Sequence, residues 1–143
     1  MRIVLDTSVI ITAIRSSTGA AAEIVRLALL GKLTILMDYK LASEYRAVAL
    51  RKQHVAVSGK THAKLTLLLD ALEAVAEPVL VVTQHHPLSQ DANDEMVLDV
   101  AINGDAEAIV TGNIKHFREP ARRFQLNLLS PPELLHEYRR RNL

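Results

Sequence analysis

The stretch RIVLDTSVI, residues 2–10, decides the fold class. Its apolar run breaks at Asp6, and two hydroxyl residues, Thr7 and Ser8, follow at once. Aspartate is a poor strand residue and is seldom buried without a partner. A strand that ends on an acid and continues as a helix usually places that acid at the rim of a sheet, where α/β proteins bind their ligands. The stretch therefore predicts an α/β protein with Asp6 at a functional edge.

Length and composition describe an ordinary globular protein. The chain has 143 residues, 49% hydrophobic and 23% charged, which fits one domain over residues 1–143. The absence of cysteine excludes disulfides and thiolate metal sites and suits a reducing cytoplasm. The net charge of +1 gives no global sign of nucleic-acid binding. With two Phe, three Tyr and no Trp, an aromatic platform that stacks RNA bases is not expected.

The N-terminus does not have the pattern of a secretion signal. Asp6 interrupts the apolar run, and Arg15 follows soon after it. No uninterrupted apolar stretch is long enough to cross a membrane. We therefore expect a cytoplasmic protein without a membrane segment.

Short apolar runs alternate with helical periodicity along the chain. The expected strands lie at 3–5, 33–37, 79–82, 108–111 and 126–129. The expected helices lie at 8–14, 20–30, 41–52, 94–103, from a cap at Ser58 to Val75, and after Ser130. This alternation is typical of a parallel sheet with helices on both faces. It predicts a three-layer α/β/α sandwich whose central parallel sheet has four to five strands.

One carboxylate follows the first predicted strand, and another lies on the helix after the second. Asp6 comes directly after the first strand. Glu44 lies on the helix after the second strand, three residues beyond Leu41 and four before Val48. This spacing predicts that Glu44 shares their inward-facing stripe rather than the solvent face.

A second group of polar residues surrounds the fourth predicted strand. Asp91 and Asp94 lie at the opening of the helix that leads into that strand, and Thr111 and Asn113 lie at its carboxyl end. In a doubly wound sheet such separate segments converge on one rim. We therefore expect them to approach Asp6.

Carboxylates gathered at one edge cannot all stay ionised unless cations neutralise them. Oxygen ligands, with no cysteine and no obvious histidine set, suit a hard cation such as Mg²⁺ or Mn²⁺. One or two such ions polarise a phosphodiester, lower the pKa of a bound water and stabilise the leaving oxygen. The acids therefore indicate metal-assisted phosphodiester hydrolysis.

Each acid also has a purely structural interpretation. Asp6 competes with Ser8 as the cap of the first helix. Glu44 can form a surface ion pair with Lys40, four residues earlier. Asp94 lies where a helix N-terminus attracts acids. The joint placement of these acids along one predicted sheet edge favours the metal site.

The chain resembles the PIN-domain family, particularly the toxin-like members of bacterial toxin–antitoxin (VapBC-type) modules. The resemblance rests on VLDTSVII at 4–11, on the Glu within LASEYRAVAL at 41–50, and on DANDEMVLDVAINGDAEAIVTGNIKHF at 91–117. It implies a sandwiched parallel sheet with clustered acids that bind Mg²⁺ or Mn²⁺. It also implies an endoribonuclease that hydrolyses RNA phosphodiester bonds by a metal-activated water.

Site residues follow from this resemblance position by position. Asp6, Glu44 and Asp94 match the three principal acids of the family and are implied as its catalytic metal ligands. Asn113 stands where many members have a fourth Asp, which removes one charge from the site. The residues implied as supporting these acids are Thr7 or Ser8, Asp91, Thr111 and Asn113.

Other polar residues have looser assignments. Asp99, five residues beyond Asp94, is expected to face solvent. The clusters 122–123 and 139–141 are basic, and the second is expected to be a solvated helix end. The residues assigned to substrate contact are His85, His86, His116, Arg122 and Arg123. For residues 85–86 a plain surface loop is the simpler interpretation.

The resemblance further implies an RNA substrate, a small antitoxin partner and a homodimer. Two other functions stay open. A catalytically degenerate member would bind RNA or a protein partner without cleaving, and Asn113 favours this alternative. A phosphoacceptor receiver domain also has acids at a sheet edge, but VLDTS lacks the paired acids that it needs.

Overall fold

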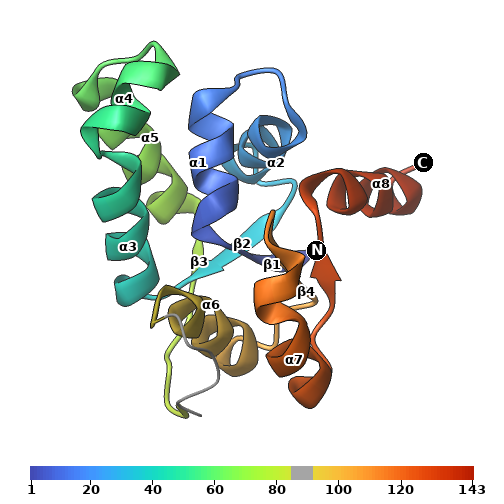
Figure 1. Ribbon diagram of the computed structural model, residues 1–143. Helices are drawn as coiled ribbons and strands as arrows, with labels where there is room; N and C mark the ends of the chain where they lie inside the picture. Colours follow the sequence, from blue (N-terminus) through green and yellow to red (C-terminus); the bar gives the residue numbers. More distant parts are fainter. Residues whose placement is uncertain (85–91) are drawn as a thin grey trace.

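The computed structural model describes residues 1–84 and 92–143, with residues 92 and 93 described by backbone alone. The described residues form one sheet of parallel strands in the order β3-β2-β1-β4-β5 (Figure 1). The strands are β1 (Arg2–Leu5), β2 (Thr34–Met37), β3 (Glu77–Pro78), β4 (Ala108–Val110) and β5 (Leu128–Leu129). The direction of winding therefore reverses between β1 and β4.

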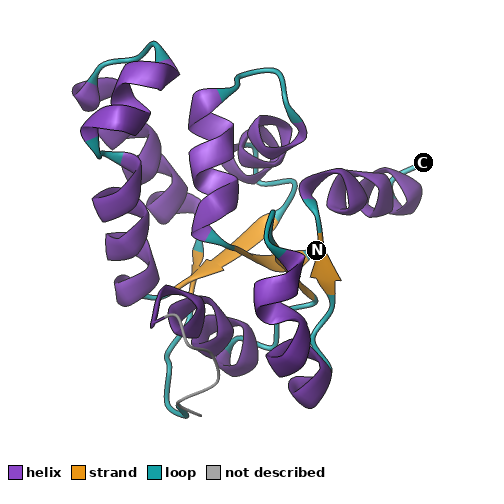
Figure 2. Cartoon of the chain, viewed as in Figure 1, coloured by secondary structure: helices purple, strands orange, loops and turns teal. Residues whose placement is uncertain are grey.

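Helices cover both faces of the sheet (Figure 2). They are α1 (Thr7–Arg15), α2 (Ala20–Leu29), α3 (Tyr39–Ala49), α4 (Lys52–Ser58), α5 (His62–Val75), α6 (Ala92–Asn103), α7 (Ile114–Phe124) and α8 (Pro131–Arg141). In Figure 1, α6 and α7 lie below the strands, α1, α2, α4, α5 and α8 lie above them, and α3 lies beside them at the end of the sheet formed by β2 and β3. The predicted α/β/α sandwich with a central parallel sheet is confirmed. None of the helices described is both long enough and apolar enough to span a bilayer.

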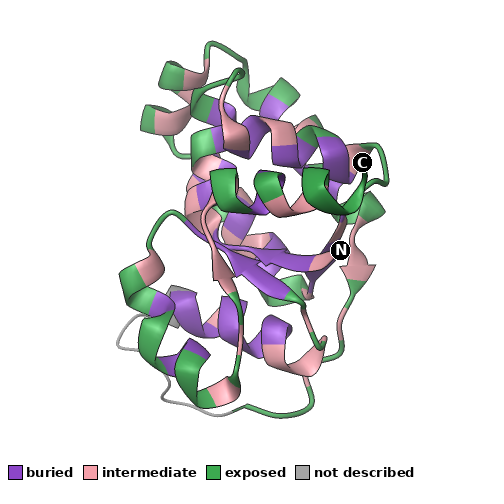
Figure 3. Cartoon of the chain, turned by 90° about the vertical axis from the view of Figure 1, so that its right-hand side faces the viewer, coloured by how far each residue is buried: buried purple, intermediate pink, exposed green. Residues whose placement is uncertain are grey.

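The centre of the core is the pair of strands β1 and β4. Ile3, Val4 and Leu5 in β1 are fully buried, as are Ile109 and Val110 in β4. Because both faces are covered, these strands are continuous apolar runs rather than alternating ones. The buried residues form a band through the middle layer in Figure 3. This core holds the carboxyl ends of β1 and β4 in fixed positions.

The third strand differs from its prediction. The structure places β3 at Glu77–Pro78, whereas the expected strand at 79–82 follows it and exposes Leu80 and Val82. The Val79 N–H still donates to the Met37 carbonyl at 2.9 Å, and strand pairing ends there. At the edge of a sheet an apolar run need not be buried, and a proline is tolerated. Hydrophobicity alone therefore misplaced this strand.

The helix predicted at 41–52 is divided in the structure. α3 ends at Ala49 and α4 begins at Lys52. Ser58 is the last residue of α4 and does not cap α5, so that prediction is wrong. Gly59, with φ of 71°, ends α4, and the Thr61 hydroxyl caps α5 by accepting from the Lys64 N–H. The left-handed turn at a glycine explains why the chain stops and restarts here.

Helix α7 has no counterpart in the prediction. It contains Pro120 in its interior and is rich in charged residues, two features that argue against a helix in a sequence. Its buried residues, Phe117, Pro120 and Ala121, nevertheless have the i, i+3, i+4 spacing of one helical face. The helix is stabilised by burial of that face.

Gly104 provides a test of the packing between α6 and the sheet. A Cβ at this position would lie 2.8 Å from the Val100 carbonyl oxygen and 3.0 Å from Leu36 Cδ1. Because the carbonyl belongs to the backbone of α6, it cannot move aside cheaply. We predict that Gly104→Ala lowers the free energy of unfolding by about 1–3 kcal/mol, measured by urea denaturation.

Gly19→Ala is the control, because its Cβ would meet only Ser16 Oγ at an ordinary 3.6 Å. We expect a smaller loss for this variant. Equal losses in the two variants would contradict the close contact at Gly104.

Candidate functional site

Asp6 lies at the switch in strand order. It follows β1, and its N–H donates to the Val110 carbonyl of β4 at 2.9 Å. Open α/β sheets bind ligands at the carboxyl ends of the two strands where the winding reverses. Asp6 is only 6% exposed, so its carboxylate is held in the structure rather than projected into solvent. This position matches the sequence prediction for Asp6.

Two hydroxyl groups orient the Asp6 carboxylate. Ser8 Oγ donates to Asp6 Oδ2 at 2.6 Å, and Thr111 Oγ1 donates to the same oxygen at 2.8 Å. The Gly112 N–H donates to Ser8 Oγ, and the Asn113 N–H donates to Thr111 Oγ1. These amides direct the hydroxyl protons toward Asp6. Oδ1 accepts no hydrogen bond from residues that the structure describes, so one carboxylate oxygen is fixed and the other is uncommitted.

The capping interpretation of Asp6 is wrong. Asp6 occupies the N-cap position of α1, but its side chain makes no capping hydrogen bond. Ser8 does not cap the helix either, because α1 already begins at Thr7 and Ser8 lies in its first turn. Of the two small polar residues, Ser8 is the one that contacts Asp6. Thr7 Oγ1 is buried and has no hydrogen-bond partner within the described ranges.

Asp94 and His116 lie beside each other on neighbouring helices. Asp94 is in the first turn of α6, and its side chain is 9% exposed. His116 is in the first turn of α7, and its Nδ1 is 3.7 Å from Asp94 Oδ2, which is beyond hydrogen-bond distance. Asn113 is the N-cap residue of α7, but its exposed side chain makes no capping hydrogen bond. Both His116 and Asn113 therefore have polar atoms available at this edge.

Glu44 is half-buried on α3. It forms no hydrogen bond or ion pair with any described residue, so the alternative pairing with Lys40 is not present. The inward stripe of α3 consists of Leu41, Tyr45 and Ala49, all buried, and Glu44 lies at its margin. Val48, which the sequence analysis assigned to the inward stripe, is only half-buried.

Tyr45 is a site neighbour that the sequence analysis missed. It is 3% exposed, and its hydroxyl donates to the Leu5 carbonyl at 2.5 Å, one residue before Asp6. Burial, and then the negative charges of Asp6 and Asp38, raise the pKa of Tyr45 well above its ordinary value. The bond fastens α3 to the end of β1. Tyr45 lies four residues after Leu41, a spacing that places both on the same face of a helix, and this spacing could have revealed the burial of Tyr45.

The contacts assemble two groups on one side of the sheet. Asp6, Ser8 and Thr111 form the first group, and Asp94 with His116 forms the second. α6 packs against β1, α3 and α7, and Figure 1 shows the first turns of α3 and α6 side by side near the start of α1. Within residues 1–84 and 92–143, no three His, Asp or Glu side chains are gathered closely enough to hold one ion.

The chemistry of the donors nevertheless fits a hard cation. They are carboxylate oxygens from Asp6, Glu44 and Asp94 and an amide oxygen from Asn113, which are the ligand types of Mg²⁺ and Mn²⁺. The uncommitted Oδ1 of Asp6 and the Glu44 carboxylate have no competing partner among the described residues. The donor set is therefore compatible with a divalent ion.

Helix α6 buries two further acids. Glu95 is 4% exposed and was missed, and Asp99 is 6% exposed although it was expected to face solvent, so that prediction is wrong. The reason is that α6 is covered on several sides, by the sheet, α3 and α7. Its apolar residues, including Val97, Leu98 and Val100, extend around the helix, which is the sequence signal of an enclosed helix.

The two arginines predicted to contact substrate lie away from the start of α7. Arg122 and Arg123 lie at the far end of α7, about 13 Å along the helix from Asn113. Arg122 pairs with Glu119, and Arg123 lies over the Phe124 ring at 5.3 Å. The residues that fall outside the described ranges are His85, His86 and Asp91.

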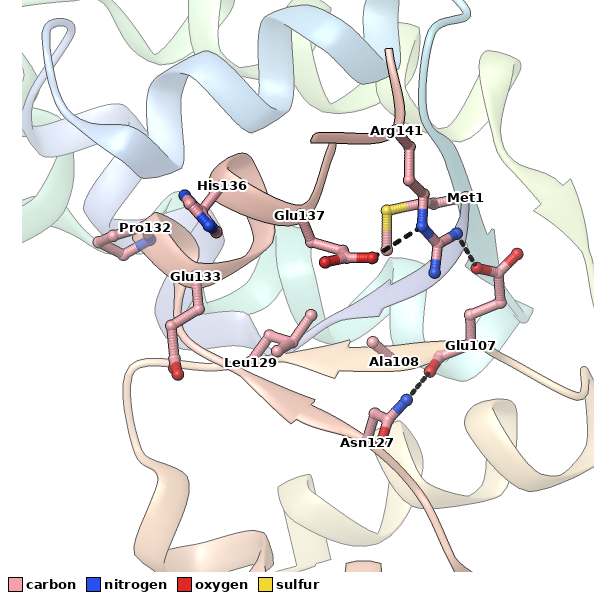
Figure 4. Close-up of a pocket in the computed structure, with 10 residues that line it drawn as sticks. All are labelled: Met1, Glu107, Ala108, Asn127, Leu129, Pro132, Glu133, His136, Glu137 and Arg141. Carbon is pink, nitrogen blue, oxygen red and sulfur yellow. Dashed lines mark hydrogen bonds and ion pairs between the residues drawn. The ribbon is translucent and has the colours of Figure 1, made fainter. Parts of the chain in front are cut away.

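A separate hollow of about 760 Å³ lies below α8 (Figure 4). Met1 and Glu107, which precede β1 and β4, line it, so it opens at the opposite edge of these strands from Asp6. Arg141 spans it, contacting Glu107 at 2.8 Å and Glu137 at 2.9 Å. Hydrogen bonds from Arg140 and Arg141 lower the pKa of Glu137 to about 2. This hollow contains none of the predicted metal ligands.

Comparison with known proteins identifies the family. The family model of the PIN domain matches residues 2–115, a segment that includes Asp6, Glu44, Asp94 and Asn113. The chain belongs to the PIN-domain family. The fold of this PIN domain is similar to the crystal structure of VapBC2 from Rickettsia felis bound to a DNA fragment from their promoter. The TM-score is 0.61 at 20% identity, covering 91% of this chain and 98% of that chain. A search of curated proteins gives no match.

Thr111 provides a test of how the Asp6 carboxylate is held. Its side chain is fully buried, and valine replaces its hydroxyl by a methyl group of similar size. Thr111→Val removes one donor from Asp6 Oδ2 and the acceptor of the Asn113 N–H. We predict that it lowers the free energy of unfolding by about 1–3 kcal/mol in urea denaturation. Thr111→Ser keeps the hydroxyl and should lose less; a Val variant as stable as the wild type would refute the proposed bond.

Proposed function

We propose that this PIN domain is a Mg²⁺- or Mn²⁺-dependent endoribonuclease, the toxin of a toxin–antitoxin module. The observation that carries the proposal is the Asp6 carboxylate at the strand-order switch, with one oxygen fixed by Ser8 and Thr111 and the other uncommitted. A buried carboxylate oriented in this way is suited to bind a cation. Membership of the PIN-domain family supports nuclease chemistry at this position.

The roles of the residues follow from their surroundings. Asp6, Glu44 and Asp94 would hold the ion, which when bound polarises the phosphodiester and lowers the pKa of a water. Ser8 and Thr111 keep Asp6 oriented by donating to Oδ2. Asn113 offers an uncharged oxygen at the end of β4. His116 is 59% exposed beside Asp94, where it can contact a phosphate of the substrate.

The partner, the oligomeric state and the location are inferred from membership of the PIN-domain family. We propose a small antitoxin as the protein partner, a homodimer as the oligomeric state and the cytoplasm as the location. The structural similarity to VapBC2, a complex bound to promoter DNA, supports the antitoxin.

A second candidate function is binding without cleavage. Asn113 favours it, because a neutral amide replaces the fourth acid that many PIN domains have. Titration of the wild type with Mn²⁺, together with an RNA cleavage assay, separates the two. Metal-dependent cleavage supports the nuclease, whereas RNA binding with no cleavage at any metal concentration supports the degenerate protein.

Substitution of the three acids tests the metal site. We predict that Asp6→Asn, Glu44→Gln and Asp94→Asn each reduce metal-dependent RNA cleavage by about 100-fold or more, because each removes a charge that the ion requires. The measurement is the initial rate of cleavage of a labelled RNA at saturating Mg²⁺. Asp70→Asn is the control, because Asp70 is an exposed partner of Arg46. Undiminished cleavage in Asp6→Asn, with the fold verified by circular dichroism, would rule out the proposed site.

A substitution that adds an acid at Asn113 tests the proposed metal site by strengthening it. Asn113→Asp adds a carboxylate where the side chain is exposed and makes no capping bond. We predict about tenfold tighter Mn²⁺ binding, measured by calorimetric titration, since each added acid strengthens attraction for a divalent ion. Asn127→Asp, beside the hollow below α8, should leave the affinity unchanged. An equal effect of both substitutions would show that only overall charge matters.

A further inference from the structure

A long segment of the chain contains cations but no acid. Between Glu44 and Asp70 there are five lysines and arginines and two histidines, and no Asp or Glu. The segment includes the end of α3, all of α4 and the start of α5. In a chain whose net charge is +1, this is a strong local excess.

In the folded structure the end of α1 lies against this segment. Arg15, the last residue of α1, has its guanidinium 3.3 Å from Nδ1 of His54 on α4. Lys60 lines a small hollow with Ala13 and Ser17 at the same end of α1. We call the resulting surface the α1–α4 basic patch; its members are Arg15, Arg51, Lys52, His54 and Lys60.

The positive charge of the α1–α4 basic patch is not neutralised. Its four lysines and arginines are exposed, and none pairs with a carboxylate in the described parts of the chain. By contrast, Arg26 pairs with Glu23, and Arg46 pairs with two acids. Partial burial, and then the charges of Arg15 and Arg51, lower the pKa of His54. A positive field therefore exists at this surface.

The patch does not serve the stability of the fold. Arg51 and Lys52 lie at the beginning of α4, where the helix dipole is positive and cations are unfavourable. No residue of α4 is fully buried, and Val55 packs only partly buried against the core, so this helix adds little to it. Unfavourable charges on a helix without a buried face are typical of a surface kept for function.

The patch lies within reach of the proposed metal site. α1 has nine residues and spans about 13 Å, with Asp6 directly before it and Arg15 at its end. α3 makes a second connection, since Glu44 lies on it and Arg51 follows it. A few nucleotides of single-stranded RNA cover this distance.

We propose that the α1–α4 basic patch binds the phosphate backbone of the RNA substrate a few nucleotides from the bond that is cut. The proposal rests on the proposed ribonuclease function. The patch contains no Phe, Tyr or Trp, and four of its five members are lysines or arginines, so it contacts phosphates rather than stacking bases. Binding through it is insensitive to sequence and weakens steeply with salt.

Binding is measured separately from cleavage. The probe is a labelled single-stranded RNA of mixed sequence, titrated with Arg51→Gln/Lys52→Gln in EDTA over a range of KCl and followed by fluorescence anisotropy. We expect about tenfold weaker binding at low salt, and a salt slope smaller by about 1.4, since each phosphate contact contributes about 0.7 on single strands. Lys32→Gln/Arg139→Gln removes the same charge from exposed residues elsewhere and should change neither quantity.

A second variant distinguishes loss of the RNA contact from loss of structure in α4. Lys60→Gln lies outside that helix, and we expect it to weaken RNA binding about threefold with an unchanged unfolding midpoint. With Mg²⁺ present, the double variant should cleave a long RNA more slowly but a dinucleotide at the wild-type rate.

Equal RNA binding by the patch and control variants would overturn the proposal. A loss confined to duplex DNA, or to an acidic protein partner, would overturn it as well. A wild type that binds RNA through the patch without cleaving it would refute the nuclease and not the patch, so the two failures are distinguishable.

Discussion

The structure depends on one buried carboxylate oxygen with two hydroxyl donors. Asp6 Oδ2 accepts hydrogen bonds from the hydroxyl of Ser8, in the first turn of α1, and from the hydroxyl of Thr111, at the end of β4. A carboxylate removed from water is costly unless such bonds replace its hydration. The Thr111 bond joins segments 105 residues apart, and both bonds go to Oδ2, which leaves Oδ1 without a hydrogen bond from the described residues. Stability and the proposed chemistry therefore require the same orientation of Asp6.

The fold class and the position of Asp6 were predictable because they depend on local patterns. Alternating apolar runs indicated β1, β2 and β4 close to their observed bounds. A second acid, Asp38, directly follows β2 and caps α3, where its side chain accepts the Leu41 N–H at 2.8 Å. Asp6 follows a short apolar run that begins at the third residue and is too short for a helix, so it is expected at the end of a strand, and it lies there.

Other features depend on which faces the fold covers, and sequence spacing does not report this. Tyr45 is buried because α3 lies against the end of β1, and Asp99 is buried because α6 is enclosed by the sheet, α3 and α7. α7 was missed because it is rich in charged residues and because one member of its buried face, Pro120, argues against a helix interior. The placement of Glu44 as a metal ligand stays a prediction, since within the described ranges no three acids or histidines are gathered closely enough to hold one ion.

The central position of β1 has a consequence for motion. Strands bonded on both sides open only when the whole molecule unfolds, whereas outer helices fray independently. The Asp6 amide, bonded to the Val110 carbonyl, lies in this central region, so we expect its exchange to follow the global unfolding equilibrium. α4, which buries none of its residues, belongs to the least protected class. The carboxylate therefore keeps its orientation while the periphery fluctuates.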